Sequence, residues 1–290
     1  MFEIKIGEYI ERAIEWLSRV AEPFFDGITA FIEAIVTGFQ SALLYPHPYI
    51  IIVLLTILGY YLPAKAKGLF TKEGWKAGRG IGFFTLIGLI LLLGMGFWEE
   101  TMQTFALVIS SALIALAIGI PLGIWAARND SVESIVRPIL DFMQTMPAFV
   151  YLIPAILFFS VGNVPGVVAT VVFSLPPGVR LTNLGIRNVQ EDVVEASHSF
   201  GATDRQLLFK VQLPLAKPTI LAGVNQVIML ALSMVVIASM VGAAGLGEKV
   251  YTGILQADIA LGFEAGLGIV ILAIILDRLT QALGVNKSNS

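Results

Sequence analysis

Residues 101–127 read TMQTFALVISSALIALAIGIPLGIWAA and contain no charged side chain. An α-helix needs about 20 predominantly apolar residues to cross the roughly 30 Å hydrocarbon core of a bilayer. This stretch is therefore predicted to be a membrane-spanning helix. Since lipid offers no partners to backbone polar groups, a chain built around such a stretch is predicted to be all-α and polytopic.

The composition of the whole chain agrees with this prediction. Of its 290 residues, 57% are hydrophobic and 13% are charged, against about 25% charged in an average soluble domain. The mean hydropathy is +0.84, and the net charge of -3 is too small to imply nucleic-acid binding. There is no cysteine, and His47 and His198 are far apart, so neither a metal site nor a catalytic site is predicted.

Apolar stretches elsewhere bring the number of predicted spans to seven. The loop that follows the first span carries five basic residues against Glu73 alone, which marks it as cytoplasmic. Alternation from this loop places residues 187–217 and the C-terminus on the cytoplasmic side and the N-terminus outside. We expect no charged residue inside a span, with Glu264 only at an entrance. The predicted spans are residues 49–62, 80–98, 101–127, 147–161, 164–186, 219–241 and 264–283.

Several segments depart from simple spanning helices. Residues 3–21 and 24–40 have the period of amphipathic helices, so residues 1–45 are predicted to form a scaffold that lies in the membrane interface. Residues 46–100 then form two accessory spans. Prolines are expected to bend the middle helices at Pro147, Pro154, Pro176 and Pro177. Glycines in residues 241–262 predict a re-entrant or surface segment.

The loop over residues 187–217 is the most polar part of the chain. Its eight charged residues, at about 2.5–3.5 kcal/mol each in a span, exclude it from lipid. Asn188 is predicted to cap a first helix that stops near Gly201, where a left-handed glycine suits a helix end. Thr203 and Gln206 have the spacing of a capping box for a second helix, predicted to end at Leu213-Pro214.

A specific motif lies within this loop. Glu195-Ala196-Ser197, three residues, Gly201, nine residues and Val211-Gln212-Leu213-Pro214 resemble the EAA loop of binding-protein-dependent ABC importer permeases. The third motif position is Ser197 instead of alanine, which exchanges one small residue for another. The resemblance implies that the loop docks in a groove of the ATP-binding subunit, with Glu195, Ala196 and Gly201 as the coupling core.

The resemblance extends over most of the chain and weakens in the first 45 residues. Residues 101–283 look like the five-helix permease domain of type I importers, and residues 284–290 are a tail. Residues 144–149 (QTMPAF), 210–214 (KVQLP) and 231–236 (ALSMVV) resemble glycine betaine/proline betaine permeases more narrowly. The resemblance implies an osmoprotectant importer. Such an importer would contain a homodimer of this chain, two ATP-binding subunits that carry ATP and Mg, and an external betaine-binding protein.

Polar and soft side chains in the predicted spans are candidates for a translocation pathway. Polar residues also join helices to one another, and methionine fills irregular gaps, so packing is the alternative for each of them. The candidates are Met146, Pro147, Phe149, Asn225, Gln226, Met229 and Ser233.

Other functions stay open at this point. The chain has no GxxxxGK[ST] motif, so it is not predicted to bind ATP in that manner. A permease for another small polar solute would have the same features. An ion-coupled carrier would need charged residues inside its spans, and a passive channel would leave the docking loop unexplained.

Overall fold

The computed structural model describes residue 12, residues 16–68 and residues 71–284, and every regular element in these ranges is helical. Most of the amphipathic helix predicted over residues 3–21 lies outside the described residues. In chain order the elements are α2 (Glu22–Leu44), α3 (Pro48–Ala66), α4 (Lys72–Gly94), α5 (Trp98–Arg128), α6 (Asp130–Thr145), the 3-10 helix η1 (Ala148–Tyr151), α7 (Leu152–Phe159), α8 (Asn163–Arg187), α9 (Glu191–Ser199), α10 (Asp204–Leu207), the π-helical turn η2 (Leu208–Gln212), α11 (Leu213–Ser233), α12 (Val235–Ser239), α13 (Leu246–Gln256) and α14 (Ile259–Gly284).

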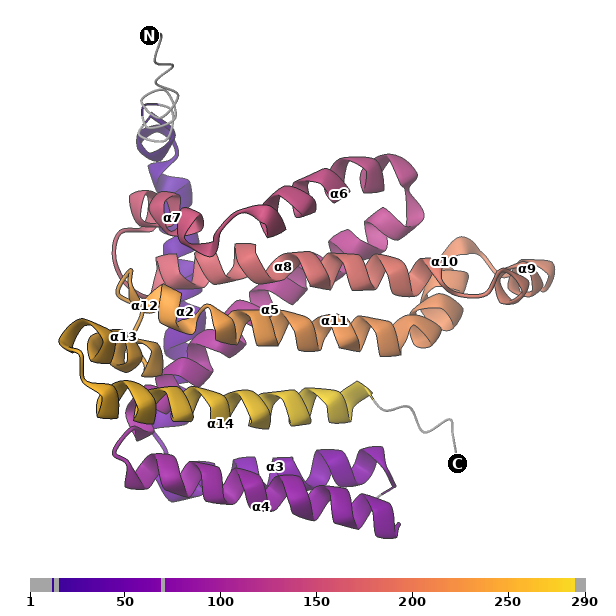
Figure 1. Ribbon diagram of the computed structural model, residues 1–290. Helices are drawn as coiled ribbons and strands as arrows, with labels where there is room; N and C mark the ends of the chain where they lie inside the picture. The colour runs from indigo at the N-terminus through magenta and orange to yellow at the C-terminus, as the bar shows by residue number, and fades with distance from the viewer. Residues whose placement is uncertain (1–11, 13–15, 69–70, 285–290) are drawn as a thin grey trace.

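Seven of the described helices are long and apolar enough to cross a membrane: α2, α3, α4, α5, α8, the run from α10 through α11, and α14. The number agrees with the sequence prediction, but the membership differs, because residues 22–44 qualify and residues 147–161 do not. Helices α3, α4, α8, α11 and α14 run along one common direction, and α5 crosses them obliquely (Figure 1).

Three features share one end of this bundle (Figure 1). They are the connection from α3 to α4, the α9–α10 segment and the end of α14. Helices α7, α12 and α13 lie at the opposite end. Alternation of the predicted spans placed the basic loop, residues 187–217 and the C-terminus on one side of the membrane, and the fold has the same relative arrangement.

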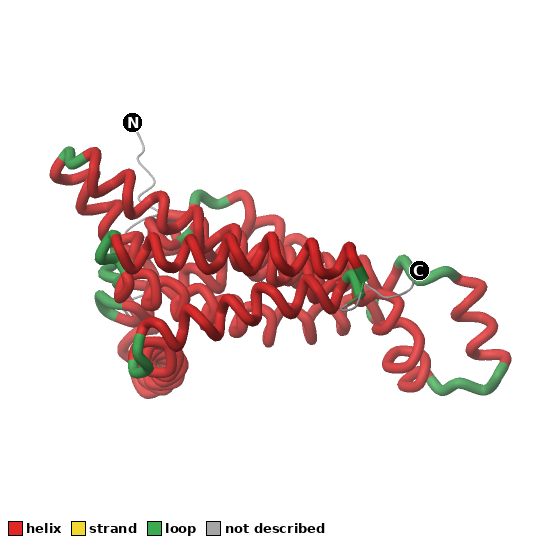
Figure 2. The backbone as a smooth tube through the Cα atoms, turned by 90° about the horizontal axis from the view of Figure 1, so that it is seen from below, coloured by secondary structure: helices red, strands yellow, loops and turns green. Residues whose placement is uncertain are grey.

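Helix α2 lies crosswise to the bundle, at the end away from α9, and is seen end-on in the second view (Figures 1 and 2). It packs on α5, α7 and α8 through its apolar face, where Ile32 and Val36 are buried. The Phe25 ring stacks on that of Phe158 with 4.4 Å between centroids. A helix that lies across the spanning direction cannot traverse the same bilayer, which favours the predicted interfacial position despite its spanning length.

The span predicted over residues 147–161 is not one continuous helix, although together with α6 the segment forms a bent pair that is long and apolar enough to span. This segment contains η1 and the eight-residue α7, and the axis turns by 107° between α6 and the η1–α7 unit. The break falls at Pro147, which has no N–H to donate and disfavours helical backbone at Met146. A second sharp turn follows at Ser160, a non-glycine residue with φ of 60°.

Helix α8 is the centre of the fold. Its Val167 and Val179 are almost completely buried, and α5 and α11 pack along its length. A bend was predicted at Pro176 and Pro177. Helix α8 nevertheless runs as one helix from Asn163 to Arg187, with both prolines inside it. The backbone carbonyls that these prolines leave without an N–H partner lie in a buried part of the helix, where neighbouring groups can satisfy them.

The accessory pair α3–α4 forms the far edge of the bundle, next to α14 (Figure 1). Helix α4 begins at Lys72, well before the predicted start near residue 80. The reason is a helix cap, since the Thr71 hydroxyl accepts a hydrogen bond from Gly74 N at 3.0 Å. Leu89 and Leu92 of α4 are fully buried against α14 and the start of α5.

The span predicted over residues 219–241 is interrupted. Helix α11 ends at Ser233, Met234 is completely buried, and the short α12 follows. The predicted glycine-rich segment then contains the 11-residue α13, too short to span. Its first amide, Leu246 N, donates to Thr104 Oγ1 at 2.8 Å, which fixes α13 to α5.

Candidate functional site

The polar loop forms a projection at one end of the bundle. Helix α9 follows α8 after a short turn and extends beyond the bundle, and α10 returns the chain to α11 (Figure 1). Acidic Glu191 and Asp192 occupy the first turn of α9, where the helix dipole favours negative charge. The loop therefore presents a compact surface outside the part of the bundle that lipid would surround.

The turn between the two short helices is built as predicted. Gly201 has φ of +79°, in the left-handed region that favours glycine, and its amide donates to His198 O at 2.8 Å. Thr203 and Gln206 form the predicted capping box at the start of α10. These local interactions shape the turn between α9 and α10.

Two details of the loop were predicted wrongly. Asn188 does not cap the first helix, because it ends α8, and Gln190 precedes α9 without a side-chain cap hydrogen bond. The second helix also does not end at Leu213-Pro214. It continues through the π turn η2 into α11, where Pro214 is the second residue and, because the run is continuous, has no N–H to donate to the preceding turn.

The nominated motif residues divide between two faces. Glu195, Ala196 and Gly201 are exposed, and so is Pro214. The half-buried residues of the motif are Ser197 and Leu213, which face the body of the loop, and the Ser197 hydroxyl donates to Val193 O at 2.7 Å. A cleft of about 300 Å³ lies beside Glu195 and is also lined by Arg187, Glu191 and Gln212.

Sequence reasoning missed Phe200. It stands immediately before Gly201, and 92% of its surface is exposed. A bare phenylalanine on a loop that is too polar to enter lipid is typical of a protein contact surface. The available signal was its position, an aromatic residue flanking the turn of a predicted docking loop.

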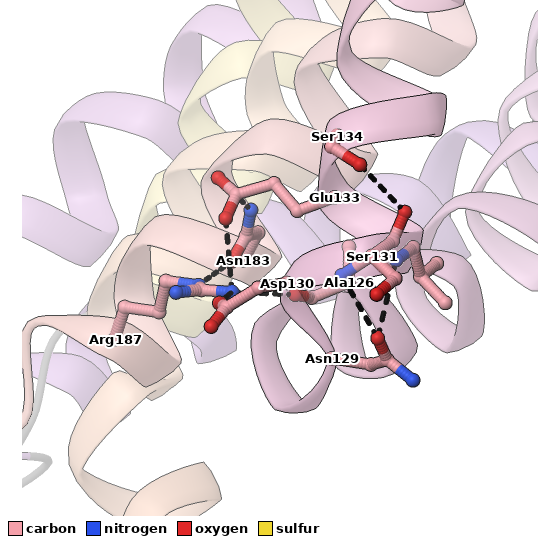
Figure 3. Close-up of polar contacts among 9 residues, drawn as sticks. Ala126, Asn129, Asp130, Ser131, Glu133, Ser134, Asn183 and Arg187 are labelled. Atoms are coloured by element: carbon pink, nitrogen blue, oxygen red, sulfur yellow. Dashed lines mark hydrogen bonds and ion pairs between the residues drawn. The ribbon is translucent and has the colours of Figure 1, made fainter.

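Arg187 joins the base of the loop to the turn between α5 and α6 (Figure 3). Its guanidinium donates to Ala126 O at 2.9 Å and lies 2.7 Å from Asp130 Oδ1 and 2.9 Å from Glu133 Oε2. Asn183 accepts from Arg187 Nε at 3.0 Å and donates to Glu133 Oε1 at 3.1 Å. Sequence reasoning placed Arg187 in the polar loop but did not identify this network.

Further polar contacts extend this attachment in both directions. Arg180, two turns earlier in α8, bonds to Asp141 and Gln144 of α6. Arg128, at the end of α5, lies 3.9 Å from Asp204 of α10. The loop is thus tied to α5 and α6 by side chains, and to α8 and α11 by a continuous backbone.

The pathway candidates separate into three groups. Gln226, Met229 and Ser233 share one exposed face of α11, so they are available to line a passage. Asn225 is turned away from this face, and its amide joins α11 to α14 by donating to Asp277 Oδ1 at 3.1 Å. The remaining candidates lie at the break between α6 and η1: Met146, Pro147 and Phe149.

Asp277 also corrects the expectation that the spans hold no interior charge. It lies within α14, and its carboxylate accepts from Gln281 as well as from Asn225. Arg278, next to Asp277 in α14, and Arg180 in α8 are also charged residues within predicted spans. Asp277 and Arg180 have polar partners, and Arg278 Nε lies 4.0 Å from Asp277 Oδ2, as charged groups in spans generally require. No cluster of three or more metal-ligating side chains occurs among the described residues.

The described helices form a bundle with membrane-spanning lengths and a capped helix–glycine turn–helix at one end, and comparison with known proteins identifies this arrangement as a membrane-embedded transport component. Residues 119–285 match the family described as binding-protein-dependent transport system inner membrane component, and the chain belongs to this family. It is a multi-pass membrane protein and a transport subunit.

Three relatives are similar over most of their length. The chain is 50% identical to the glycine betaine transport system permease protein OpuAB of Bacillus subtilis (strain 168), covering 99% of this chain and 96% of that protein. It is 52% identical to the glycine betaine/carnitine transport permease protein GbuB of Listeria monocytogenes serotype 1/2a (strain 10403S), covering 96% and 95%. It is 50% identical to the glycine betaine/proline betaine transport system permease protein ProW of Escherichia coli (strain K12), covering 97% and 75%.

The fold is also that of a solved transporter. The MetNI methionine ABC transporter, in an inward-facing conformation, has a chain that aligns with a TM-score of 0.60 at 23% identity. The alignment covers 69% of this chain and 98% of that chain, which establishes the type I importer permease core.

Proposed function

We propose that this chain is the permease subunit of an ATP-driven importer of glycine betaine or a related compatible solute, used in osmoregulation. The exposed helix–glycine turn–helix at one end of the bundle carries the proposal, because a passive bundle has no need of it. Relatives at 50–52% identity that are named for glycine betaine transport support the choice of substrate class.

The working assembly we propose contains two copies of this chain, two ATP-binding subunits and an external betaine-binding protein in a cell membrane. ATP and Mg belong to the partner ATPase, and no cofactor is assigned to this chain. The basic loop, the docking loop and the C-terminus face the cytoplasm, and the N-terminus is outside. Residues 1–45 lie in the interface as a scaffold, residues 46–100 are accessory spans, and residues 101–283 are the permease domain.

The docking loop contacts the ATPase through its outer face, where Ala196, Phe200 and Gly201 are exposed. Movement of α9 on ATP-driven closure reaches α11 directly, since α10, η2 and α11 form one continuous run. It reaches α5 and α6 through Arg187 and its carboxylate partners. The solute passes along the α11 face of Gln226, Met229 and Ser233, opposite the second copy, beside the corner formed by Met146, Pro147 and Phe149.

The test is ATPase activity of the reconstituted complex in lipid, with and without betaine-loaded binding protein. We expect stimulation, and we expect Glu195→Lys to abolish it while the purified chain stays folded. Glu73→Lys is the matched control, because it reverses the same charge on the other exposed connection at this end. Absence of stimulation at every ionic strength, or equal behaviour of the two variants, would refute the proposal.

Asp277 makes an ion-coupled carrier the competing function, because a carboxylate within a span is the residue such a carrier needs. Its hydrogen bonds to Asn225 and Gln281 are what a structural role requires, so they favour an ATP-driven importer over an ion-coupled carrier. Dissipating the proton and sodium gradients at constant ATP separates the two. Uptake that stops under this treatment would assign the chain to the carriers.

A further inference from the structure

The accessory pair α3–α4 carries an apolar slot on its outer surface. The slot has a volume of about 370 Å³ and is lined by Thr56, Ile57, Tyr60, Arg79, Gly82, Phe83 and Leu86. Ile57 and Phe83 form its walls and are 60% and 66% exposed, so the slot opens outward from the bundle. Its volume is within the range of small-ligand pockets.

The four α4 residues of the slot, Arg79, Gly82, Phe83 and Leu86, lie on one helix face. Over these seven positions an α-helix rises about 10 Å. Gly82 forms the floor, since a side chain there would meet Tyr60 Cβ at 3.1 Å. The Thr56 hydroxyl lines the slot and has no hydrogen-bond partner in the described part of the chain. The slot is thus an open groove with one charged end.

The charged end of the slot carries a residue type found at membrane interfaces. Trp75, one turn before Arg79 and 55% exposed, is the residue type that marks the boundary between lipid headgroups and hydrocarbon. The Arg79 guanidinium lies 4.5 Å from the Trp75 ring centroid, and no ion pair of Arg79 is found within the described ranges. Arg79 therefore holds an uncompensated positive charge where a headgroup would be.

The surroundings of the slot mouth are basic. Lys65, Lys67, Lys72 and Lys76 are exposed on the same connection as Arg79, with Glu73 as the acidic residue among them. Lys72, Lys76 and Arg79 follow each other at helical spacing, so they share one face of α4. Basic pockets of this kind beside membrane helices attract anionic headgroups.

We propose that the α3–α4 slot is a binding site for an anionic phospholipid, with its phosphate on Arg79 and one acyl chain in the slot. The neutral wall of the slot and its cationic mouth match the two ends of such a lipid. A free phosphate would leave the apolar wall uncovered. A zwitterionic lipid would place its headgroup cation next to the lysines, which would repel it. The proposal depends on the membrane location of the chain and not on which solute it carries.

The experiment is native mass spectrometry of the full chain in detergent, titrated with phosphatidylglycerol or phosphatidylcholine of equal chain length. We expect phosphatidylglycerol to be retained about tenfold more strongly, because the phosphate of either lipid can reach Arg79 but the choline cation of phosphatidylcholine would face the lysines. Arg79→Gln should weaken retention of both lipids, since it removes the phosphate contact, and Arg79→Lys should keep part of that retention. Lys217→Gln is the matched control, since Lys217 is exposed on α11, away from the slot, and this variant should retain both lipids as wild type does.

Three results would overturn the proposal. Equal retention of the two lipids would mean that the basic mouth does not select an anionic headgroup. Equal losses in Arg79→Gln and Lys217→Gln would indicate a general effect of surface charge without a site, with Arg79 only reaching toward water. Glycerophosphoglycerol lacks acyl chains. If it competed as strongly as intact lipid, the apolar slot would contribute nothing to binding. Melting of Arg79→Gln at the wild-type temperature controls for folding.

Discussion

The contact between α5 and α8 gives the sharpest prediction of the structure. Gly119 and Gly123 lie one turn apart on α5 and both face α8. An alanine Cβ at position 123 would meet Val179 O and Thr182 Cβ, each at 2.6 Å, whereas at position 119 its nearest neighbour would be Val179 N at 3.5 Å. The first distance is shorter than real contacts, and the second is an ordinary van der Waals contact.

The expected difference follows from these distances. Gly→Ala raises helix propensity by roughly 0.5–1 kcal/mol at either position, so this term cancels between the two variants. Gly123→Ala must in addition push two backbones apart, and overpacking of this kind costs about 1–3 kcal/mol. We therefore expect Gly123→Ala to be less stable than Gly119→Ala by about 1–3 kcal/mol.

The assay is thermal unfolding of the two purified variants in the same detergent, followed by loss of the monodisperse peak in size-exclusion chromatography. Gly119→Ala should melt at or above the wild-type temperature and Gly123→Ala well below it. Equal melting temperatures would show that α5 and α8 do not approach this closely at Gly123, and would remove the basis for placing the α5–α6 turn against Arg187.

Three further predictions concern the polar contacts and the exposed loop. Arg187→Lys keeps the charge but loses the forked geometry, so it should lower the free energy of unfolding by about 1–2 kcal/mol. Arg128 forms an exposed ion pair at 3.9 Å, so Arg128→Lys should change that free energy by less than about 1 kcal/mol. Asn225→Ala deprives Asp277 and Thr280 of a partner and should cost about 1–3 kcal/mol in a melting assay, without altering the solute preference of the complex. Phe200→Ser should leave the free energy of unfolding within about 0.5 kcal/mol of wild type, because the side chain is exposed. It should nevertheless weaken co-purification of the ATPase. Wild-type co-purification of Phe200→Ser would place the docking contact elsewhere.

Some local chemistry was predictable from the sequence, although the Asn188 cap was predicted wrongly. The Gly201 turn and the Thr203–Gln206 cap are examples, because both depend on neighbouring residues. The length and apolarity of most spans were equally readable, since the thickness of the bilayer sets them. The relative side of the connections followed from counting these spans.

Features decided by distant residues were not predictable. Hydropathy treats residues 147–161 as continuous, whereas the backbone turns at Pro147 and sends η1 and α7 back across the end of the bundle. Asn225 and Asp277 are 52 positions apart, and only the packing of α11 on α14 turns them toward each other. The partners of Arg187 lie on another helix hairpin, so its role was hidden as well.

The crosswise position of α2 has a consequence for the order in which the protein is made. Its buried residues Ile32 and Val36 pack against α5 and α8, so their partners are synthesised up to about 130 residues later. At 5–20 residues per second, this is a delay of roughly 6 to 26 s. During that interval the apolar face of α2 needs temporary cover from lipid or from the insertion machinery, and the N-terminal segment, although translated first, finds its packing partners only after α8 has been made.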